Sequence, residues 1–142
     1  MSGIDPAKIA AYQDTDYVVR ARQGQFVLRI GQVSQGLQVL YAETGKSTAV
    51  FITAFNPEGA LQADALNQAA HEALRNALSA LTDLLFEGEG RGTEDNAGWP
   101  AEKSFLALGI DQEESARLGR QFRQDAVVRA GPDGVPELLL LR

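Results

Sequence analysis

Polar side chains that could do chemistry gather where the predicted elements of this chain end. Residues 51–57 read FITAFNP, so Thr53 and Asn56 stand at the end of a nearly unbroken apolar run that predicts a buried strand. Ligand sites in open sheets cluster at the carboxyl ends of strands. Asn56 and Pro57 are also residue types that form turns, so a purely structural role is the alternative.

A second group of candidates lies on a long helix predicted over residues 61–86. Asn67 falls within the leucine stripe of this helix, where a buried amide without partners would cost about 1–3 kcal/mol. Asn67 therefore either bonds the connection between strand and helix or points into a polar cavity. His71, the only histidine of the chain, lies at the edge of the stripe, and Arg75 flanks it. A histidine can exchange protons near neutral pH, although a lone histidine on a helix edge is commonly structural.

Further candidates stand at the ends of elements closer to the C-terminus. Glu102 and Ser104 enter a predicted strand two residues apart, which places them on one side of it. Glu102 could act as a base, paired with His71 if both face one cavity, or could simply bind an arginine. Gln124 and Asp125 end the following helix, where the connection needs side-chain hydrogen bonds in any case.

The tripeptide Gly45-Lys46-Ser47 matches the end of a nucleotide-binding loop, but the rest of that motif is missing. The motif requires a glycine five residues before Gly45, where Leu40 stands, and a helix after the loop. A strand pattern follows Ser47 instead, so no helix N-terminus stands behind the loop to hold a phosphate. The tripeptide is explained equally well if Gly45 ends a helix and Lys46 is a solvated turn residue.

Composition narrows the chemistry further. The chain of 142 residues has no cysteine, which excludes disulfides, thiolate catalysis and cysteine-based zinc sites. With one histidine no transition-metal site is expected, and the acidic residues near position 90 lack the spacing of a calcium loop. No serine lies in a G-x-S-x-G context. We therefore expect no metal and no cofactor.

Charge and hydropathy bear on partners and location. The net charge is −6, whereas a surface that binds DNA or RNA is normally basic, so no nucleic acid is expected. No apolar run reaches the ~18 residues of a membrane span, and the N-terminus has no signal-peptide pattern. These features predict a cytoplasmic protein that binds no membrane. They do not indicate an oligomeric state.

The pattern of elements predicts one α+β domain over residues 1–142. Alternating or apolar stretches predict strands at 17–22, 25–30, 48–55, 104–109, 126–130 and 137–141. Helices are predicted at 34–45, 61–86 and 111–124, with Ser34 and Asp111 as caps; a strand through 37–41 is the alternative for the first. The order β-β-α-β-α-β-α-β-β implies a mixed sheet packed with one long and two shorter helices. Residues 1–14 are a short helix or loose lead-in, and the polar, glycine-rich residues 87–99 form a long loop.

Several motifs, taken in this order, resemble a small bacterial family known only as a domain of unknown function. They are LRIG at 28–31, FITAFNP at 51–57, Asn67, WPAEKSFLALGI at 99–110 and FRQDAVV at 122–128. The resemblance spans residues 17–141, and FITAFNP is its most specific part. The chain departs from the family pattern at Lys103 and Asp125, where proline and asparagine are usual. The resemblance implies a compact cytoplasmic domain of about this length and supplies no activity, substrate or catalytic residue.

The motif positions and the helix candidates together define a predicted site. The positions matching the family pattern are Thr53, Asn56, Pro57, Asn67, Glu102, Ser104, Gln121 and Gln124. The candidate ligand-binding residues are Thr53, Asn56, Asn67, His71, Arg75, Glu102, Ser104, Gln121 and Gln124. The first hypothesis is a polar small-ligand pocket at the end of the FITAFNP strand, with the reaction, if any, unassigned. The second is a non-enzymatic acidic module that regulates or contacts a protein partner.

Overall fold

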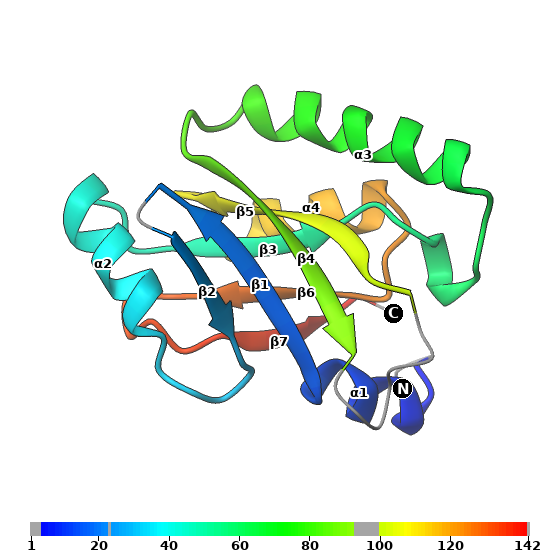
Figure 1. Cartoon of the computed structure of the whole chain (residues 1–142), viewed down its shortest axis with the longest axis horizontal. Coiled ribbons are helices and arrows are strands. Elements are labelled where there is room, and N and C mark those ends of the chain that lie inside the picture. Colours follow the sequence, from blue (N-terminus) through cyan, green and yellow to red (C-terminus); the bar gives the residue numbers. More distant parts are fainter. Residues whose placement is uncertain (1–3, 23, 93–99, 142) are drawn as a thin grey trace.

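The computed structural model of the chain describes residues 4–22, 24–92 and 100–141 (Figure 1). Its strands are β1 (Thr15–Ala21), β2 (Gly24–Leu28), β3 (Ala49–Thr53), β4 (Leu85–Gly92), β5 (Glu102–Leu108), β6 (Ala126–Ala130) and β7 (Glu137–Leu140). Its helices are α1 (Pro6–Gln13), α2 (Gln35–Thr44), α3 (Asp64–Ser79) and α4 (Gln112–Gln121), with a 3-10 turn, η1 (Pro57–Gly59), after β3. The lead-in is thus a short helix, and the predicted α+β class is confirmed.

The seven strands form one sheet in the order β2-β1-β4-β5-β3-β6-β7, and the described pairings are antiparallel throughout. The sequence predicts a mixed sheet because β3, a helix and β5 read as one strand–helix–strand unit. Strand β4 lies between that helix and β5 and forms a hairpin with β5, so that β5 runs back antiparallel to β3. One additional strand therefore changes the relative direction of its neighbours.

The prediction for residues 61–92 is wrong in detail. Helix α3 ends at Ser79, not at 86, and residues 85–92 form β4 where a helix end and a loop are predicted. Thr82 holds the connection, since its hydroxyl donates to the carbonyl of Leu108 and accepts from the amide of Leu84. The pattern EGEGRG at 87–92 is a strand alternation whose inner positions are glycine. The rest of the predicted loop, 93–99, lies outside the described residues.

The residues predicted to cap or end the helices do so in the structure. Ser34 and Asp111 accept hydrogen bonds from the amides three residues on, and so cap α2 and α4. Gly45 ends α2 in the left-handed conformation with φ of 75°. Strand β3 follows four residues later, so a helix precedes the GKS tripeptide and a strand follows it. Gly119 lets α4 approach the sheet, because a Cβ there would lie 2.3 Å from Leu141 Cδ1.

The core consists of two clusters, one on each face of the sheet. On one face α3 and α4 cover side chains that include Val50, Ile52, Phe105 and Val127. On the other face α2 covers one end, and its Leu37 and Leu40 belong to the buried cluster that includes Val19, Leu28 and Leu108. Helix α1 lies over the opposite end of this second face (Figure 1). No helix of the described part is both long and apolar enough to cross a membrane.

The sheet is curled into a half-barrel whose concave face carries α1 and α2. Strands β1 and β3 are three steps apart in the sheet, which in a flat sheet is about 14 Å at ~4.8 Å per step. Yet the rings of Tyr17 on β1 and Phe51 on β3 meet edge to face with centroids 5.3 Å apart. The curl therefore brings the two halves of the sheet into contact.

Candidate functional site

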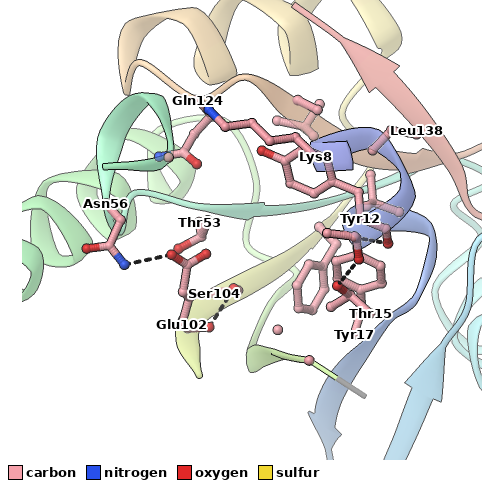
Figure 2. Close-up of a pocket in the computed structure, with 18 residues that line it drawn as sticks. Lys8, Tyr12, Thr15, Tyr17, Thr53, Asn56, Glu102, Ser104, Gln124 and Leu138 are labelled. Carbon is pink, nitrogen blue, oxygen red and sulfur yellow. Dashed lines mark hydrogen bonds between the residues drawn. The ribbon is translucent and has the colours of Figure 1, made fainter. Parts of the chain in front are cut away.

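A cavity of about 270 Å³ lies between α1 and the concave face of the sheet (Figure 2). Its walls come from α1, from every strand except β2, and from the connections that follow β3 and α4. It lies toward the end of the sheet where β3 finishes and where β5 and β6 begin. This is the end at which the FITAFNP segment leads out of the sheet.

The structure brings together some of the predicted site residues and separates others. Those lining the cavity are Thr53, Asn56, Glu102, Ser104 and Gln124. Asn67 lies behind this wall, in contact with Asn56. The remaining three, His71, Arg75 and Gln121, are not among the lining residues. The polar residues at the ends of β3, β5 and α4 therefore share one hollow, and the helix residues do not.

Asn56 and Asn67 form a reciprocal pair behind the cavity wall. The side-chain amide of Asn67 donates to Asn56 Oδ1 at 3.0 Å, and the backbone N–H of Asn56 donates to Asn67 Oδ1 at 2.9 Å. Both residues are buried, with 4% and 5% of their surface exposed. Asn56 adopts the left-handed conformation at φ of 47°, which asparagine tolerates better than most residues. Asn67 thus bonds the connection between strand and helix, the first of the two roles the sequence allows.

The pair also fixes a carboxylate at the cavity wall. Asn56 Nδ2 donates to Glu102 Oε2 at 2.7 Å, as drawn in Figure 2. Gln62 completes the network, because its backbone N–H donates to Asn56 Oδ1 and its Nε2 donates to Asn67 Oδ1. Since both oxygens of the asparagine pair accept hydrogen bonds, the amide of Asn56 must turn its nitrogen toward Glu102. The relay from Asn67 through Asn56 therefore sets the position of the Glu102 side chain.

Hydroxyl groups on the concave face are tied to the backbone. Thr53 donates to the carbonyl of Lys103 at 2.7 Å and Ser104 to that of Glu102 at 3.0 Å. Tyr17 donates to the carbonyl of Tyr12 at 2.6 Å, which joins β1 to α1. Burial raises the pKa of Tyr17 well above its ordinary value, so this phenol keeps its proton at neutral pH.

The connection after α4 supplies an amide and a buried charge. Gln124 Nε2 donates to the carbonyls of Phe55 and Phe122, at 3.1 and 3.3 Å. The next residue, Asp125, has only 1% of its side chain exposed and pairs with Lys8 Nζ of α1 at 3.0 Å. Lys8 also donates to the carbonyl of Glu58. Helix α1 is therefore held at two places: an ion pair binds it to this connection, and the Tyr17 hydrogen bond binds it to β1.

Strand β4 contributes backbone in place of side chains. Beyond Phe86, its inward positions are Gly88, Gly90 and Gly92, which pair with Val19, Tyr17 and Thr15 of β1. Gly90 and Gly92 line the cavity. A Cβ on Gly90 would have its nearest neighbours at 3.8 and 3.9 Å, ordinary contact distances, so the space in front of Gly90 is open. The row of glycines thus leaves the hollow that larger side chains would fill.

His71 lies on the opposite face of the sheet. Its ring stacks on Phe105, with centroids 4.3 Å apart and planes 9° from parallel, and meets Phe55 edge to face. Phe105 and Glu102 are three residues apart on β5, so their side chains point to opposite faces. The acid–base pair of His71 and Glu102 that the sequence allows is therefore not formed. The imidazole is buried, and its Nδ1 has no hydrogen-bond partner in the described part of the chain.

Arg75 and Gln121 are also on outer surfaces. The Arg75 guanidinium lies over the ring of Phe105 and donates to Glu87 at 2.8 Å, which lowers the pKa of Glu87 below its ordinary value. Gln121 is exposed and accepts a long hydrogen bond from Arg117. The described residues contain no group of three or more histidine and acidic side chains placed to hold a metal ion.

Part of the cavity was outside the sequence-based prediction. Helix α1 contributes Lys8, Ala11 and Tyr12, and β1 contributes Thr15 and Tyr17. No local signal marks these residues as site residues, because they reach the cavity only through tertiary packing. Gly90 and Gly92, by contrast, carried a readable signal, since glycine at every second position of a strand indicates close approach or empty space.

Fold and cavity together define an antiparallel α+β half-barrel with a hollow covered by its N-terminal helix. The chain belongs to the family described as "Protein of unknown function (DUF3293)", whose model matches residues 52–127, more than half of the sequence. The matched segment contains the FITAFNP end, Asn67, Glu102 and Gln124, so the resemblance read from the sequence is confirmed. No curated protein and no solved structure matches the chain.

Proposed function

We propose that this domain binds a small organic molecule in the cavity between α1 and the concave face of the sheet. The observation that carries the proposal is Gly90. A glycine in a strand interior costs roughly 0.5–1 kcal/mol relative to alanine, and here the backbone and surroundings would accept a side chain without a clash. A residue that weakens the strand and keeps a hollow open is consistent with selection for a ligand.

Backbone conformation at the rim supports the same proposal. The described non-glycine residues with positive φ are Asn56, Glu58 and Arg123. They lie in the two connections that border the cavity, after β3 and after α4, where Glu58 N–H donates to the carbonyl of Arg123. Such conformations cost roughly 1–2 kcal/mol each and concentrate at ligand sites. The strain is therefore located where binding is proposed.

The dimensions of the cavity limit the ligand. At about 270 Å³ the cavity is slightly smaller than the roughly 300–1,000 Å³ that ligand pockets occupy, so only a small molecule fits. One end is apolar, with Phe51, Val128 and Leu138, and the other carries Glu102 and Gln124. A molecule with a short apolar body and one polar end matches this division.

Blocking the cavity tests the proposal. Wild-type protein and Gly90→Phe are screened against a library of small metabolites by thermal shift, since a ligand that binds the native state raises the melting temperature. We expect hits that stabilise the wild type and have no effect on Gly90→Phe. Val39→Phe is the matched control, because it adds the same ring at an exposed position of α2 and should retain every hit.

Two outcomes would contradict the proposal. One is a set of hits that stabilise Gly90→Phe as well as the wild type, which would place binding elsewhere. The other is the absence of any hit in a library that samples amines, acids, alcohols and sugars of this size. Gly90→Val, with a smaller side chain and a residue type that favours strands, is a second variant if the phenylalanine disturbs folding.

A further inference from the structure

Gly88 and Gly90 occupy consecutive inward positions of β4, and an aromatic ring of the protein already lies on the first of them. A Cβ on Gly88 would be 3.0 Å from Phe51 Cε2 and 3.4 Å from Phe51 Cζ, so this ring occupies the place of the missing side chain. A ring that packs on a strand glycine in this way compensates for the absent side chain, because it covers the bare backbone. Gly88 is therefore covered from within the fold.

Gly90 carries the same bare backbone, but the space in front of it belongs to the cavity. Tyr17 pairs with Gly90 across the sheet, and its ring is directed elsewhere. The Tyr17 hydroxyl donates to the carbonyl of Tyr12 on α1, and the ring meets Phe51 edge to face. A Cβ on Gly90 would consequently be 3.9 Å from Tyr17 Cδ1 and 3.8 Å from Thr15 Cγ2, at ordinary contact distances. Tyr17 and Thr15 lie along one side of this space (Figure 2).

The cavity has the volume and the walls to take a ring at this place. A cavity of about 150 Å³ lined by apolar side chains is enough to hold benzene, and this one measures about 270 Å³. Both Tyr17 and Phe51 line it together with Gly90. A ring over Gly90 would therefore meet two aromatic side chains, and aromatic pairs favour such offset or edge-to-face contacts.

We infer that the ligand carries a flat aromatic ring, which lies on the backbone of Gly90 beside Tyr17 as the ring of Phe51 lies on Gly88. This inference rests on the proposed function and names the chemical class for the same cavity. A saturated ring is thicker, because its hydrogens project above and below the carbon atoms, and it cannot approach bare backbone as closely. A plain apolar cavity would instead favour the saturated ring, which has the larger apolar surface.

Matched pairs of probes test the inference. Benzyl alcohol is compared with cyclohexylmethanol, and benzamide with cyclohexanecarboxamide, so that each pair shares a neutral head group and differs in the ring. Binding to the wild type is measured by calorimetry and ligand-observed NMR. We expect the aromatic member of each pair to bind roughly threefold to tenfold more tightly. Its ring protons should also show nuclear Overhauser contacts to the Hα protons of Gly90.

Gly90→Ala tests the place of the ring. The added methyl group stands where the ring would lie on the backbone, so we expect it to weaken binding of the aromatic probes about fivefold or more. The methyl group itself meets only ordinary contacts, so the fold should be retained. Gly131→Ala is the matched control, because it makes the same change outside the cavity, where the nearest neighbour of the new Cβ is Arg129 Nη2 at 3.6 Å. This variant should bind the probes as the wild type does.

The outcomes separate this inference from the proposed function. Saturated probes that bind as tightly as their aromatic partners, and that Gly90→Phe excludes, would show that the cavity holds a ligand without selecting a flat ring. Failure of every aromatic probe would overturn the inference, as would equal binding of these probes by Gly90→Ala and the wild type. Equal binding of the aromatic probes by Gly90→Phe and the wild type would contradict both the inference and the proposed function.

Discussion

The rings of Tyr17 and Phe51 meet at 5.3 Å across two intervening strands. The contact is possible because the residue between them on the concave face of β4 is Gly88, which pairs with Val19 of β1 and Ser104 of β5. A Cβ on Gly88 would lie 3.0 Å from Phe51 Cε2 and 2.3 Å from the carbonyl oxygen of Val18. The absence of one side chain thus allows the sheet to curl, and the curl encloses the cavity.

Gly88 and Gly90 of β4 should therefore respond in opposite ways to the same substitution. Gly88→Ala forces a methyl group against backbone and an aromatic ring, and we expect it to lower the free energy of unfolding by about 1–3 kcal/mol. Gly90→Ala meets only ordinary contacts, and removing the strand glycine should raise stability by roughly 0.5 kcal/mol or more. Urea unfolding of both variants beside the wild type measures the difference. Equal destabilisation by the two substitutions would show that the space at Gly90 is not empty.

The sequence located the polar end of the cavity because that end depends on local rules. An apolar run followed by Asn-Pro marks the end of a buried strand, and the two-residue period puts Glu102 and Ser104 on one face, as the structure has them. The N-terminal wall could not be read, since Lys8 and Tyr12 approach Gln124 only through the tertiary fold. The sequence predicts His71 at the same cavity because periodicity orients a helix toward the sheet without indicating which face of the sheet the helix covers.

The sequence-based prediction lacks strand β4 for a different reason. Glycine and charged residues are common in loops, so the composition of EGEGRG predicts a loop, whereas its alternation is that of a strand. Its charges lie on the outer face, where Glu89 pairs with both Arg20 and Arg91, and its glycines lie inside. The pattern therefore has the two-residue period of a strand, with glycine at the inward positions where a strand normally carries apolar side chains.

Asn67 should be important for stability even though it does not line the cavity. Asn67→Ala leaves the buried backbone N–H of Asn56 without its acceptor and removes one of the two donors to Asn56 Oδ1, and we expect a loss of about 2–3 kcal/mol. Asn76→Ala, an exposed asparagine on the same helix, should change stability by less than about 0.5 kcal/mol. Thermal and urea unfolding of the two variants provide the comparison. A small effect at Asn67 would mean that water replaces its amide and that the relay does not hold Glu102.

Helix α1 should depend on the ion pair between Lys8 and Asp125. Lys8→Met removes a charge partner of a carboxylate that is 1% exposed, and we expect a loss of about 1–3 kcal/mol. Asp125→Asn in the Lys8→Met background should recover part of that loss, with a coupling energy of roughly 0.5–3 kcal/mol. Lys46→Met, at an exposed lysine, is the control. Strictly additive effects in the double-mutant cycle would show that the pair contributes nothing to holding α1 over the cavity.

His71 should make folding stability depend on pH between about 7.5 and 5.5. Burial and, to a lesser extent, the nearby Arg75 cation lower its pKa from the ordinary 6.5. The unfolded chain therefore takes up a proton at a higher pH than the folded chain does, so this contribution to stability is present above 6.5 and is lost as pH falls toward the lowered value. The loss by pH 5.5 should be up to about 1 kcal/mol, given 1.36 kcal/mol per pKa unit.

His71→Phe identifies the source of that slope. Phenylalanine keeps the stacking on Phe105 and removes both the titrating group and the Nδ1 that lacks a partner. Because His71 is the only histidine, urea unfolding of this variant should vary less between pH 7.5 and 5.5 than that of the wild type. Glu113→Gln, at an exposed position of α4 that is not among the charges acting on His71, should keep the wild-type slope. An unchanged slope in His71→Phe would mean that the imidazole is protonated as readily in the folded chain as in the unfolded one, and that its burial against Phe105 does not exclude the charged form.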